Sequence, residues 1–226
     1  MGAVAGRVAA RICYNESIVE RPDLDRLRDL MQRHCFQYGD FTLSSGRKSS
    51  YYYNGKRVML RPEGARLIGE ALVDVIIASG AEAVGGPELG AVPIAMAIGL
   101  ASVSRAREVP IFVVRKAQKE YGARDLIVEP YVDDGEALIA PGRRVAVVED
   151  TITTGGSVRK ALDALEELGA SVALIAVLVE RAEGGAGTLR EAGYDVVSVF
   201  RADEAGHLSL NEDYARRLEA ARAAVR

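Results

Sequence analysis

The stretch RRVAVVEDTITTGGSVRKAL, residues 143–162, contains the signals of a strand, a turn and a helix in direct succession. VAVV is a continuous apolar run, which is typical of a strand buried on both faces. The turn TITTGGS is rich in hydroxyls and glycines, and Ser157 is placed to cap the helix that follows. A buried strand that leads through a short turn into a helix is the repeating unit of a parallel α/β sheet.

The rest of the chain repeats this alternation. Apolar residues at helical spacing predict one helix from an N-cap at Asp23 to a stop at Gly39, and a second helix that ends at Gly80. Continuous apolar runs predict further buried strands in AEAVGG, PIFVVRK, ASVALIAVLVER and DVVSVFR. The pattern therefore predicts an α/β fold, with a central, mostly parallel sheet that is flanked by helices.

Composition limits the class of protein. The chain has 226 residues, of which 49% are hydrophobic and 27% charged, so it fits one globular domain with a substantial core. We expect residues 23–226 to form that domain and residues 1–22 to be an N-terminal extension. A net charge of -3 provides no broad basic field, and no apolar run is long enough for a bilayer, so neither nucleic acid nor a membrane is an expected partner.

Cysteine and histidine are scarce. Cys13 and Cys35 have no metal-ligand spacing, which fits a reducing, cytoplasmic location. His34 and His207 are the only histidines, and this excludes a histidine metal cluster. Both histidines are expected to be structural.

Two adjacent carboxylates, Glu149 and Asp150, separate the buried strand from the hydroxyl-rich turn. The backbone N–H groups of residues 154–157, the hydroxyls and the positive end of the helix together suit a phosphate monoester. The acids would repel a phosphate placed on them, but they can accept hydrogen bonds from sugar hydroxyls, so a sugar phosphate satisfies both parts. The alternative is an ordinary capped corner between strand and helix. The stretch is neither a Walker loop nor the GxGxxG of dinucleotide folds.

The stretch VVEDTITTGGS resembles the phosphoribosyl pyrophosphate signature of the type I phosphoribosyltransferases. The segments FTLSSGRKSSYYYNG (41–55), FVVRKAQKEYG (112–122) and LVERAEGG (178–185) are similar to segments of the orotate phosphoribosyltransferases within that family. The resemblance spans residues 24 to about 200. It implies the type I phosphoribosyltransferase fold, with a small N-terminal hood and a flexible lid loop at about residues 117–141.

The resemblance also implies an activity. This is the magnesium-dependent transfer of the 5-phosphoribosyl group from phosphoribosyl pyrophosphate to orotate, which gives orotidine 5'-monophosphate and pyrophosphate on the way to UMP. The cofactor Mg²⁺ would be bound mainly through the substrate and water, with no direct protein ligand. A homodimer is implied, in which each lid reaches the active site of the partner subunit. Two alternatives stay open: a phosphoribosyltransferase for another base, and a non-catalytic regulator that senses phosphoribosyl pyrophosphate.

Site residues follow from the matching motifs. The catalytic set implied is Asp150, Glu149, Lys119 and Arg115. Contacts to phosphoribosyl pyrophosphate are implied for Arg115, Lys116, Lys119, Tyr121, Glu149, Asp150, Thr151, Ile152, Thr153, Thr154, Gly155, Gly156 and Ser157. The orotate contacts implied are Thr153, Arg181, Tyr52 and Tyr53. The planar fork of an arginine suits both oxygens of a carboxylate, and a mobile cationic lid suits a pyrophosphate leaving group.

Two positions depart from part of the family. Some members carry a lysine where this chain has Ser44, and another lysine where it has Gly90. Two phosphate contacts are therefore missing relative to those members.

Overall fold

The computed structural model describes residues 21–42, 46, 48–105, 107–117, 126–129 and 137–224. Within these ranges the chain forms, in order, α1 (Leu24–Cys35), β1 (Phe36–Thr42), β2 (Lys48–Tyr53), α2 (Lys56–Met59), α3 (Pro62–Ala78), β3 (Ala83–Pro87), α4 (Ala91–Ser102), β4 (Ile111–Val114), β5 (Ile127–Val128), β6 (Arg144–Ile152), α5 (Gly156–Glu167), β7 (Ser171–Arg181), α6 (Gly185–Glu191), β8 (Val196–Ala202), β9 (Leu208–Leu210) and α7 (Glu212–Ala224).

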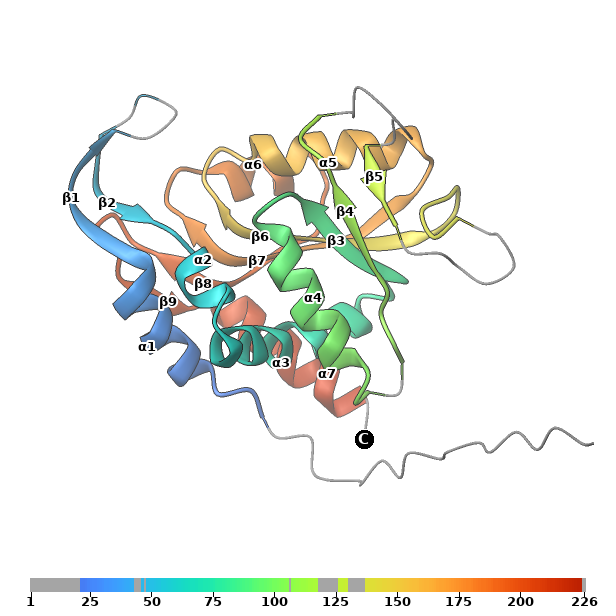
Figure 1. The fold of residues 1–226 in the computed structure, drawn as a ribbon, viewed down its shortest axis with the longest axis horizontal. Helices are drawn as coiled ribbons and strands as arrows, with labels where there is room; N and C mark the ends of the chain where they lie inside the picture. The colour runs from blue at the N-terminus through green and yellow to red at the C-terminus, as the bar shows by residue number, and fades with distance from the viewer. Residues whose placement is uncertain are drawn as a thin grey trace, which may run out of the picture.

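The main sheet confirms the predicted, mostly parallel arrangement (Figure 1). Its strand order is β5-β4-β3-β6-β7-β8-β9. The pairs from β4 through β3, β6 and β7 to β8 are parallel, while β5 and β9 add antiparallel edges. Because the five inner strands run the same way, their carboxyl ends lie along one edge of the sheet.

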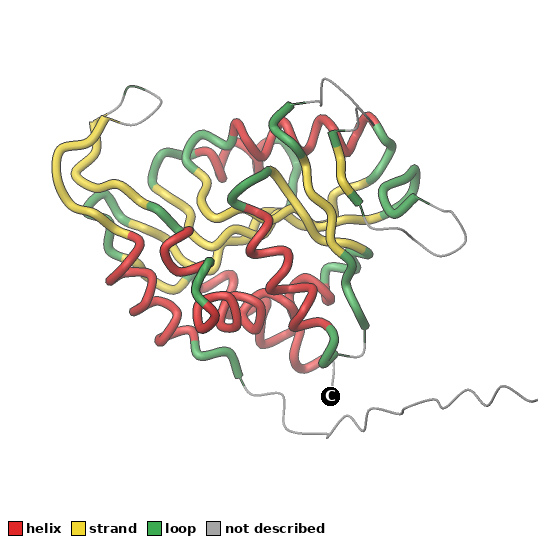
Figure 2. The backbone as a smooth tube through the Cα atoms, in the orientation of Figure 1, coloured by secondary structure: helices red, strands yellow, loops and turns green. Residues whose placement is uncertain are grey.

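Helices cover both faces of the sheet, with α5 and α6 on one side and α3, α4 and α7 on the other (Figures 1 and 2). Strand β6 shows why its apolar run is continuous. Ala146 and Val148 pack in the core beneath α3 and α4, while Val145 and Val147 pack in the core beneath α5. Successive side chains of a strand point to opposite faces, so a strand covered on both faces needs apolar residues at every position.

The predicted hood is formed by α1, the β1–β2 hairpin and α2, which lie beside the main sheet (Figure 1). The hood contacts the turn between β8 and β9. The Tyr51 hydroxyl donates to the Asp203 carbonyl at 3.4 Å, the Ser50 hydroxyl donates to the Glu204 carbonyl at 3.3 Å, and the Gln32 amide donates to the Gly206 carbonyl at 2.9 Å.

One helix boundary was predicted correctly and another was not. The Asp23 carboxylate accepts a hydrogen bond from the Arg26 N–H at 2.9 Å, which confirms the predicted N-cap. The predicted stop at Gly39 is wrong, because α1 ends at Cys35 and Gly39 lies within β1. Phe36 starts a strand because its ladder with β2, beginning at Tyr53, replaces the helical hydrogen bonds.

Part of the predicted lid lies within the fold. Strand β5 pairs with β4, and Leu138 and Ile139 are buried beside it. The Glu129 carboxylate accepts a hydrogen bond from the Ile139 N–H at 2.7 Å. Residues 118–125 and 130–136 of the predicted lid, and residues 1–20 of the predicted extension, lie outside the described residues. None of the helices in the described ranges has the length and apolarity that a membrane span requires.

Candidate active site

The sheet has a topological switch between β3 and β6. These strands are neighbours, but the chain goes from β3 outward to β4 on one side and from β6 outward to β7 on the other. Ligands of open α/β sheets bind at the carboxyl ends of the strands at such a point. The residues that follow β3 and those that end β6 therefore face the candidate site.

Glu149 and Asp150, hereafter the acid pair, lie at the end of β6. They are only 6% and 7% exposed. One oxygen of Glu149 accepts a hydrogen bond from the Asp150 N–H at 3.0 Å, and the other accepts one from the Ser157 hydroxyl at 3.1 Å. Burial, and then the charge of Asp150, raise the pKa of the Glu149 carboxyl to about 8. The positive charge near the acid pair is therefore too small to offset this effect on Glu149.

Lys56, the first residue of α2, supplies part of that charge. Its ammonium lies 3.4 Å from Asp150 Oδ2, and its side chain is 38% exposed. The chain comes equally close at Gly55, where a Cβ atom would lie 3.2 Å from Asp150 Oδ2 and 2.8 Å from the Tyr53 hydroxyl oxygen. Sequence reasoning missed Lys56, since Asp150 lies 94 positions further along the chain and no local spacing connects them.

Gly90, which follows β3, faces the acid pair from the other side of the switch. A Cβ atom on Gly90 would lie 2.2 Å from Glu149 Oε1 and 3.0 Å from Asp150 Oδ1. In this conformation Glu149 fills the space that a side chain at position 90 would need. The glycine that departs from part of the family thus has a steric reason in this chain.

Residues 153–156, hereafter the phosphate loop, connect the acid pair to α5. Gly155 is the N-cap and adopts φ 80°, a left-handed conformation that favours glycine. The predicted cap by Ser157 is wrong, because α5 begins at Gly156 and the Ser157 hydroxyl bonds to Glu149 instead. The N–H groups of the first helical turn have no intrahelical acceptor, and together with the positive helix end they suit an anion.

Gly185, at the start of α6, contacts the backbone of the phosphate loop. Its N–H donates to the Thr153 carbonyl at 2.9 Å, and a Cβ atom on Gly185 would lie 2.3 Å from the same oxygen. Two predicted contacts lie just before the loop in β6. Ile152 is buried, and the Thr151 hydroxyl is buried with no hydrogen-bond partner among the described residues.

Arg115 and Lys116 follow β4, whose last residue, Val114, pairs with Pro87 at the end of β3. The Lys116 N–H donates to the Glu88 carboxylate at 2.8 Å, which ties the start of the predicted lid to the loop after β3. Arg115 and Lys116 therefore lie at the same edge of the sheet as the acid pair. The two other predicted lid contacts, Lys119 and Tyr121, lie outside the described residues and stay predictions.

Arg181 ends β7 and lines a cavity of about 250 Å³, hereafter the Arg181 cavity. The lining residues are Lys48, Ser49, Ser50, Tyr51, Arg181, Ala182, Glu183, Asp203 and Glu204. Arg181 Nη2 lies 2.9 Å from Glu183 Oε1 and 3.4 Å from Ser49 Oγ. The guanidinium also lies 4.5 Å from the centre of the Tyr51 ring, a cation–π contact.

The three tyrosines of β2 separate according to strand alternation. Tyr51 and Tyr53 are buried, whereas Tyr52 is 44% exposed and its ring lies 5.8 Å from that of Phe41. The cavity thus places Tyr51 with Arg181, and neither Tyr52 nor Tyr53 is among its lining residues. Tyr51 was not in the predicted set, although the period of two along the strand could have separated it from Tyr52. The base contacts expected of Tyr52 and Tyr53 stay predictions.

Tyr53 lies close to the acid pair, since a Cβ atom on Gly55 would touch both the Tyr53 hydroxyl oxygen and Asp150 Oδ2. Its hydroxyl is buried without a hydrogen-bond partner among the described residues. Burial raises its pKa well above the ordinary value of 10.0, and nearby acidic groups add to the effect. Within the described ranges, no group of three or more His, Cys, Asp or Glu side chains could hold a metal ion.

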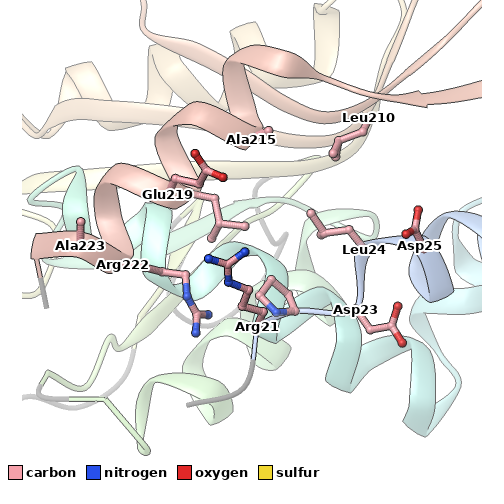
Figure 3. A pocket seen from close by; sticks show the side chains of 11 residues that line it. Arg21, Asp23, Leu24, Asp25, Leu210, Ala215, Glu219, Arg222 and Ala223 are labelled. Carbon is pink, nitrogen blue, oxygen red and sulfur yellow. The ribbon is translucent and has the colours of Figure 1, made fainter. Parts of the chain in front are cut away.

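A second cavity, of about 740 Å³, is lined by a different set of residues (Figure 3). It is formed by residues 21–25, by Leu210 and by the α7 side chains of Ala215, Leu218, Glu219, Arg222 and Ala223. It shares no residue with the acid pair, the phosphate loop or the Arg181 cavity. One of its cations, Arg222, pairs with the buried Asp74 at 3.2 Å.

Comparisons with known proteins agree with this geometry. The family model for the phosphoribosyl transferase domain matches residues 62–206. Over 179 residues, the chain is 42% identical to the orotate phosphoribosyltransferase of Bradyrhizobium sp. strain BTAi1. The aligned region covers 79% of this chain and 95% of that protein.

Solved structures give the same picture. A crystal structure of Mycobacterium tuberculosis H37Rv orotate phosphoribosyltransferase in complex with Fe(III) dicitrate has a TM-score of 0.67 and 36% identity, covering 80% of this chain and 97% of that one. A structure of the same enzyme in complex with 5-phospho-alpha-D-ribosyl 1-diphosphate has a TM-score of 0.63 and 34% identity, covering 80% and 96%.

Proposed function

Because the chain belongs to the phosphoribosyltransferase family, and within it to the orotate phosphoribosyltransferases, we propose that it transfers a 5-phosphoribosyl group from phosphoribosyl pyrophosphate to orotate. The observation that carries this proposal is the acid pair next to the N-terminus of α5 at the topological switch. One end of this arrangement suits sugar hydroxyls and the other suits a phosphate.

The phosphoribosyl group would bind along β6 and α5. The phosphate loop holds the 5-phosphate through backbone N–H groups and hydroxyls, while Glu149 and Asp150 accept hydrogen bonds from the ribose hydroxyls. As the bond to pyrophosphate breaks, positive charge develops on the ribose ring. The buried carboxylate of Asp150 stabilises that charge, because the acid pair is shielded from water.

The leaving pyrophosphate would be stabilised by cations. Arg115 and Lys116 begin at the sheet edge beside the site, and Lys119 and Tyr121 are the predicted contacts further along the lid. Mg²⁺ fits this chemistry, since oxygen ligands suit it, but the acid pair supplies carboxylates from only two residues, so the substrate and water would provide most of the coordination. When bound, the metal supplies positive charge to the phosphate oxygens.

The base would occupy the Arg181 cavity. Arg181 binds the orotate carboxylate, and Thr153, Tyr52 and Tyr53 are the other predicted contacts. Arg181 already pairs with Glu183, so a base without a carboxylate leaves the guanidinium with one partner and its buried Nε unsatisfied. An unsatisfied buried donor costs about 1 to 3 kcal/mol, and we expect orotate to be preferred over uracil by roughly 5- to 150-fold in kcat/KM.

One assay tests the reaction. Purified protein with phosphoribosyl pyrophosphate and Mg²⁺ is supplied with orotate, uracil, adenine or hypoxanthine, and pyrophosphate release is measured. We expect release with orotate and little with the other bases. A preference for another base would identify a different phosphoribosyltransferase, whereas binding of phosphoribosyl pyrophosphate without release for any base would identify a sensor.

We also propose that the protein is a homodimer in which each lid acts on the partner's active site. Lys119→Ala and Asp150→Asn would then each inactivate both sites of their homodimers. In a mixed dimer one site carries both changes and the other carries neither, so activity returns after subunit exchange. A hybrid isolated by a size tag that regains no activity would show that the lid closes over its own subunit.

A further inference from the structure

The Arg181 cavity contains a buried ion pair with two unsatisfied atoms. The side chains of Arg181 and Glu183 are only 5% and 11% exposed, and their Nη2 and Oε1 atoms lie 2.9 Å apart. Arg181 Nε and Glu183 Oε2 are both buried, and neither has a hydrogen-bond partner among the described residues. Buried polar atoms are nearly always paired in folded proteins, so an unpaired donor and an unpaired acceptor in one cavity point to a ligand.

Arg181 is held on several sides. Nη2 faces Glu183 and Ser49, and the ring of Tyr51 contacts the guanidinium through its face. An arginine side chain has many rotamers, and fixing it before the ligand arrives removes an ordering cost from binding. Nη2 thus already has partners, whereas the buried Nε has none among the described residues.

The charges around the cavity show why this fixing matters. Among the described residues, the lining contains one further cation, Lys48, and two further acids, Asp203 and Glu204, besides Arg181 and Glu183. The described acids offset the described cations, so the orientation of the Arg181 guanidinium matters for binding a ligand carboxylate. The Asp203 carboxylate is engaged elsewhere, since it accepts hydrogen bonds from the N–H groups of Ala205 and His207.

We propose that Glu183 is a positioning residue for base selection. It holds Arg181 by Nη2 against the Tyr51 ring, so that the guanidinium keeps one orientation for the carboxylate of the base. This inference rests on the proposed function, because it assumes that a carboxylated base occupies the cavity. It assigns Glu183 no contact with the reacting atoms, and so Glu183 should affect the recognition of orotate and leave the transfer step alone.

The test compares Glu183→Gln and Glu183→Ala with the wild type, using pyrophosphate release at varied orotate and at varied phosphoribosyl pyrophosphate. Glutamine keeps an oxygen that accepts from Nη2, so we expect KM for orotate to rise a few-fold in Glu183→Gln. Alanine leaves Arg181 without this partner, so we expect a rise on the order of tenfold or more. The kcat, and KM for phosphoribosyl pyrophosphate, should stay near wild type, and the preference for orotate over uracil should fall. Glu191→Gln, on the exposed surface of α6, is the matched loss of charge and should change none of these values.

A double-mutant cycle shows whether Glu183 acts through Arg181. In an Arg181→Met background, Glu183→Gln should have no further effect on KM for orotate. This comparison also works if Glu183→Ala fails to fold, because both variants of the cycle keep side chains of similar size.

Three outcomes would overturn the inference. A fall in KM for orotate in both variants would make Glu183 a competitor of the substrate carboxylate. An additive effect in the cycle would separate Glu183 from Arg181, and unchanged kinetics with a lowered Tm would leave it a purely structural residue. Failure of the proposed function is distinguishable from all three, because the wild type would then neither bind orotate in a calorimeter nor release pyrophosphate with it.

Discussion

The carboxyl ends of β6 and β7 lie side by side at the same edge of the sheet, and both are buried, but their charges are arranged in opposite ways. β6 ends in two adjacent carboxyl groups, and burial, together with the charge of Asp150, raises the pKa of Glu149 to about 8. β7 ends next to an opposite-charge pair, Arg181 with Glu183, in which one buried atom of each side chain has no partner among the described residues. The end of β6 is therefore electrostatically costly before any ligand binds, while the end of β7 is largely satisfied in advance.

This difference assigns different work to the two strands. A site that holds excess negative charge stabilises positive charge that develops during a reaction, so β6 should govern the transfer step. A site whose charges are already paired gains little general affinity for anions, and its open donor instead selects a ligand of matching shape. Substitutions on β6 should consequently change kcat, and substitutions around β7 should change the choice of base.

The largest expected effect comes from Asp150→Asn, which keeps the size of the side chain and removes its charge. We expect kcat to fall by about 100- to 1,000-fold, the usual result of removing one preorganised electrostatic contact to a transition state. The Kd for phosphoribosyl pyrophosphate, measured by calorimetry, should change by less than about tenfold, since the hydrogen bonds to ribose are partly kept. Equal losses in kcat and in binding would contradict the role given to β6.

The next effect concerns the support of the phosphate loop. In Gly185→Ala the new Cβ atom would lie 2.3 Å from the Thr153 carbonyl oxygen, so the loop must move. Overpacking of this kind costs about 1 to 3 kcal/mol, and we expect the Kd for phosphoribosyl pyrophosphate to rise by roughly 5- to 150-fold. Gly187→Ala in the same helix is the control, because a Cβ atom there has nothing within 4 Å. Similar binding by both variants would show that the loop geometry does not depend on α6.

The sequence predicted the parts of the fold that depend on local periodicity. The strand, turn and helix of residues 143–162 were found because a doubly covered strand needs an unbroken apolar run. The turn at residues 153–156 was predicted because its hydroxyls and glycines are contiguous, and phosphate binding there stays a prediction. In contrast, the helix stop at Gly39 was wrong, since the ladder between β1 and β2 decides that boundary and the helix pattern alone does not contain it.

Contacts that depend on how the chain folds in three dimensions could not be predicted from the sequence. Lys56 reaches Asp150 only because the hood places α2 over the end of β6. The Ser157 hydroxyl was expected to cap α5 and instead donates to Glu149, an acid on the preceding strand. The pairing of Arg181 with Glu183 was overlooked although only one residue separates them, because the sequence does not show that both side chains line one cavity.

The pH dependence of the reaction sharpens the comparison further. If ionised Glu149 is needed to bind the ribose hydroxyls, kcat/KM for phosphoribosyl pyrophosphate should rise about tenfold between pH 7 and pH 9, around a midpoint near the pKa of about 8. In Glu149→Gln this rise should be absent. A wild-type profile that is flat over this range would indicate that the ligand does not require the charge.

The free energy of unfolding should fall as pH rises, whereas kcat/KM should rise. The folded protein keeps the Glu149 proton up to about pH 8, while the unfolded chain releases it near the ordinary pKa of 4.5. The folded state thus binds more protons between these values, and the contribution of Glu149 to the free energy of unfolding falls as pH rises through them. Urea titrations of the wild type and Glu149→Gln should show a smaller fall for the variant. If both proteins lose the same amount, other groups account for the dependence.

The smallest effect is expected from Lys56→Gln. The Lys56 side chain is 38% exposed, and such ion pairs contribute about 0 to 1 kcal/mol, which corresponds to a change of up to about fivefold in KM for phosphoribosyl pyrophosphate. Without this ammonium the acid pair holds less compensating charge, so the midpoint of the pH profile should move slightly upward. Lys160→Gln on the exposed surface of α5 removes the same charge away from the acid pair and should leave both values unchanged. Neutralisation of Asp150 by a partly exposed lysine is too weak to change KM by well above tenfold. A rise of that size would therefore mean that Lys56 also binds the phosphates itself.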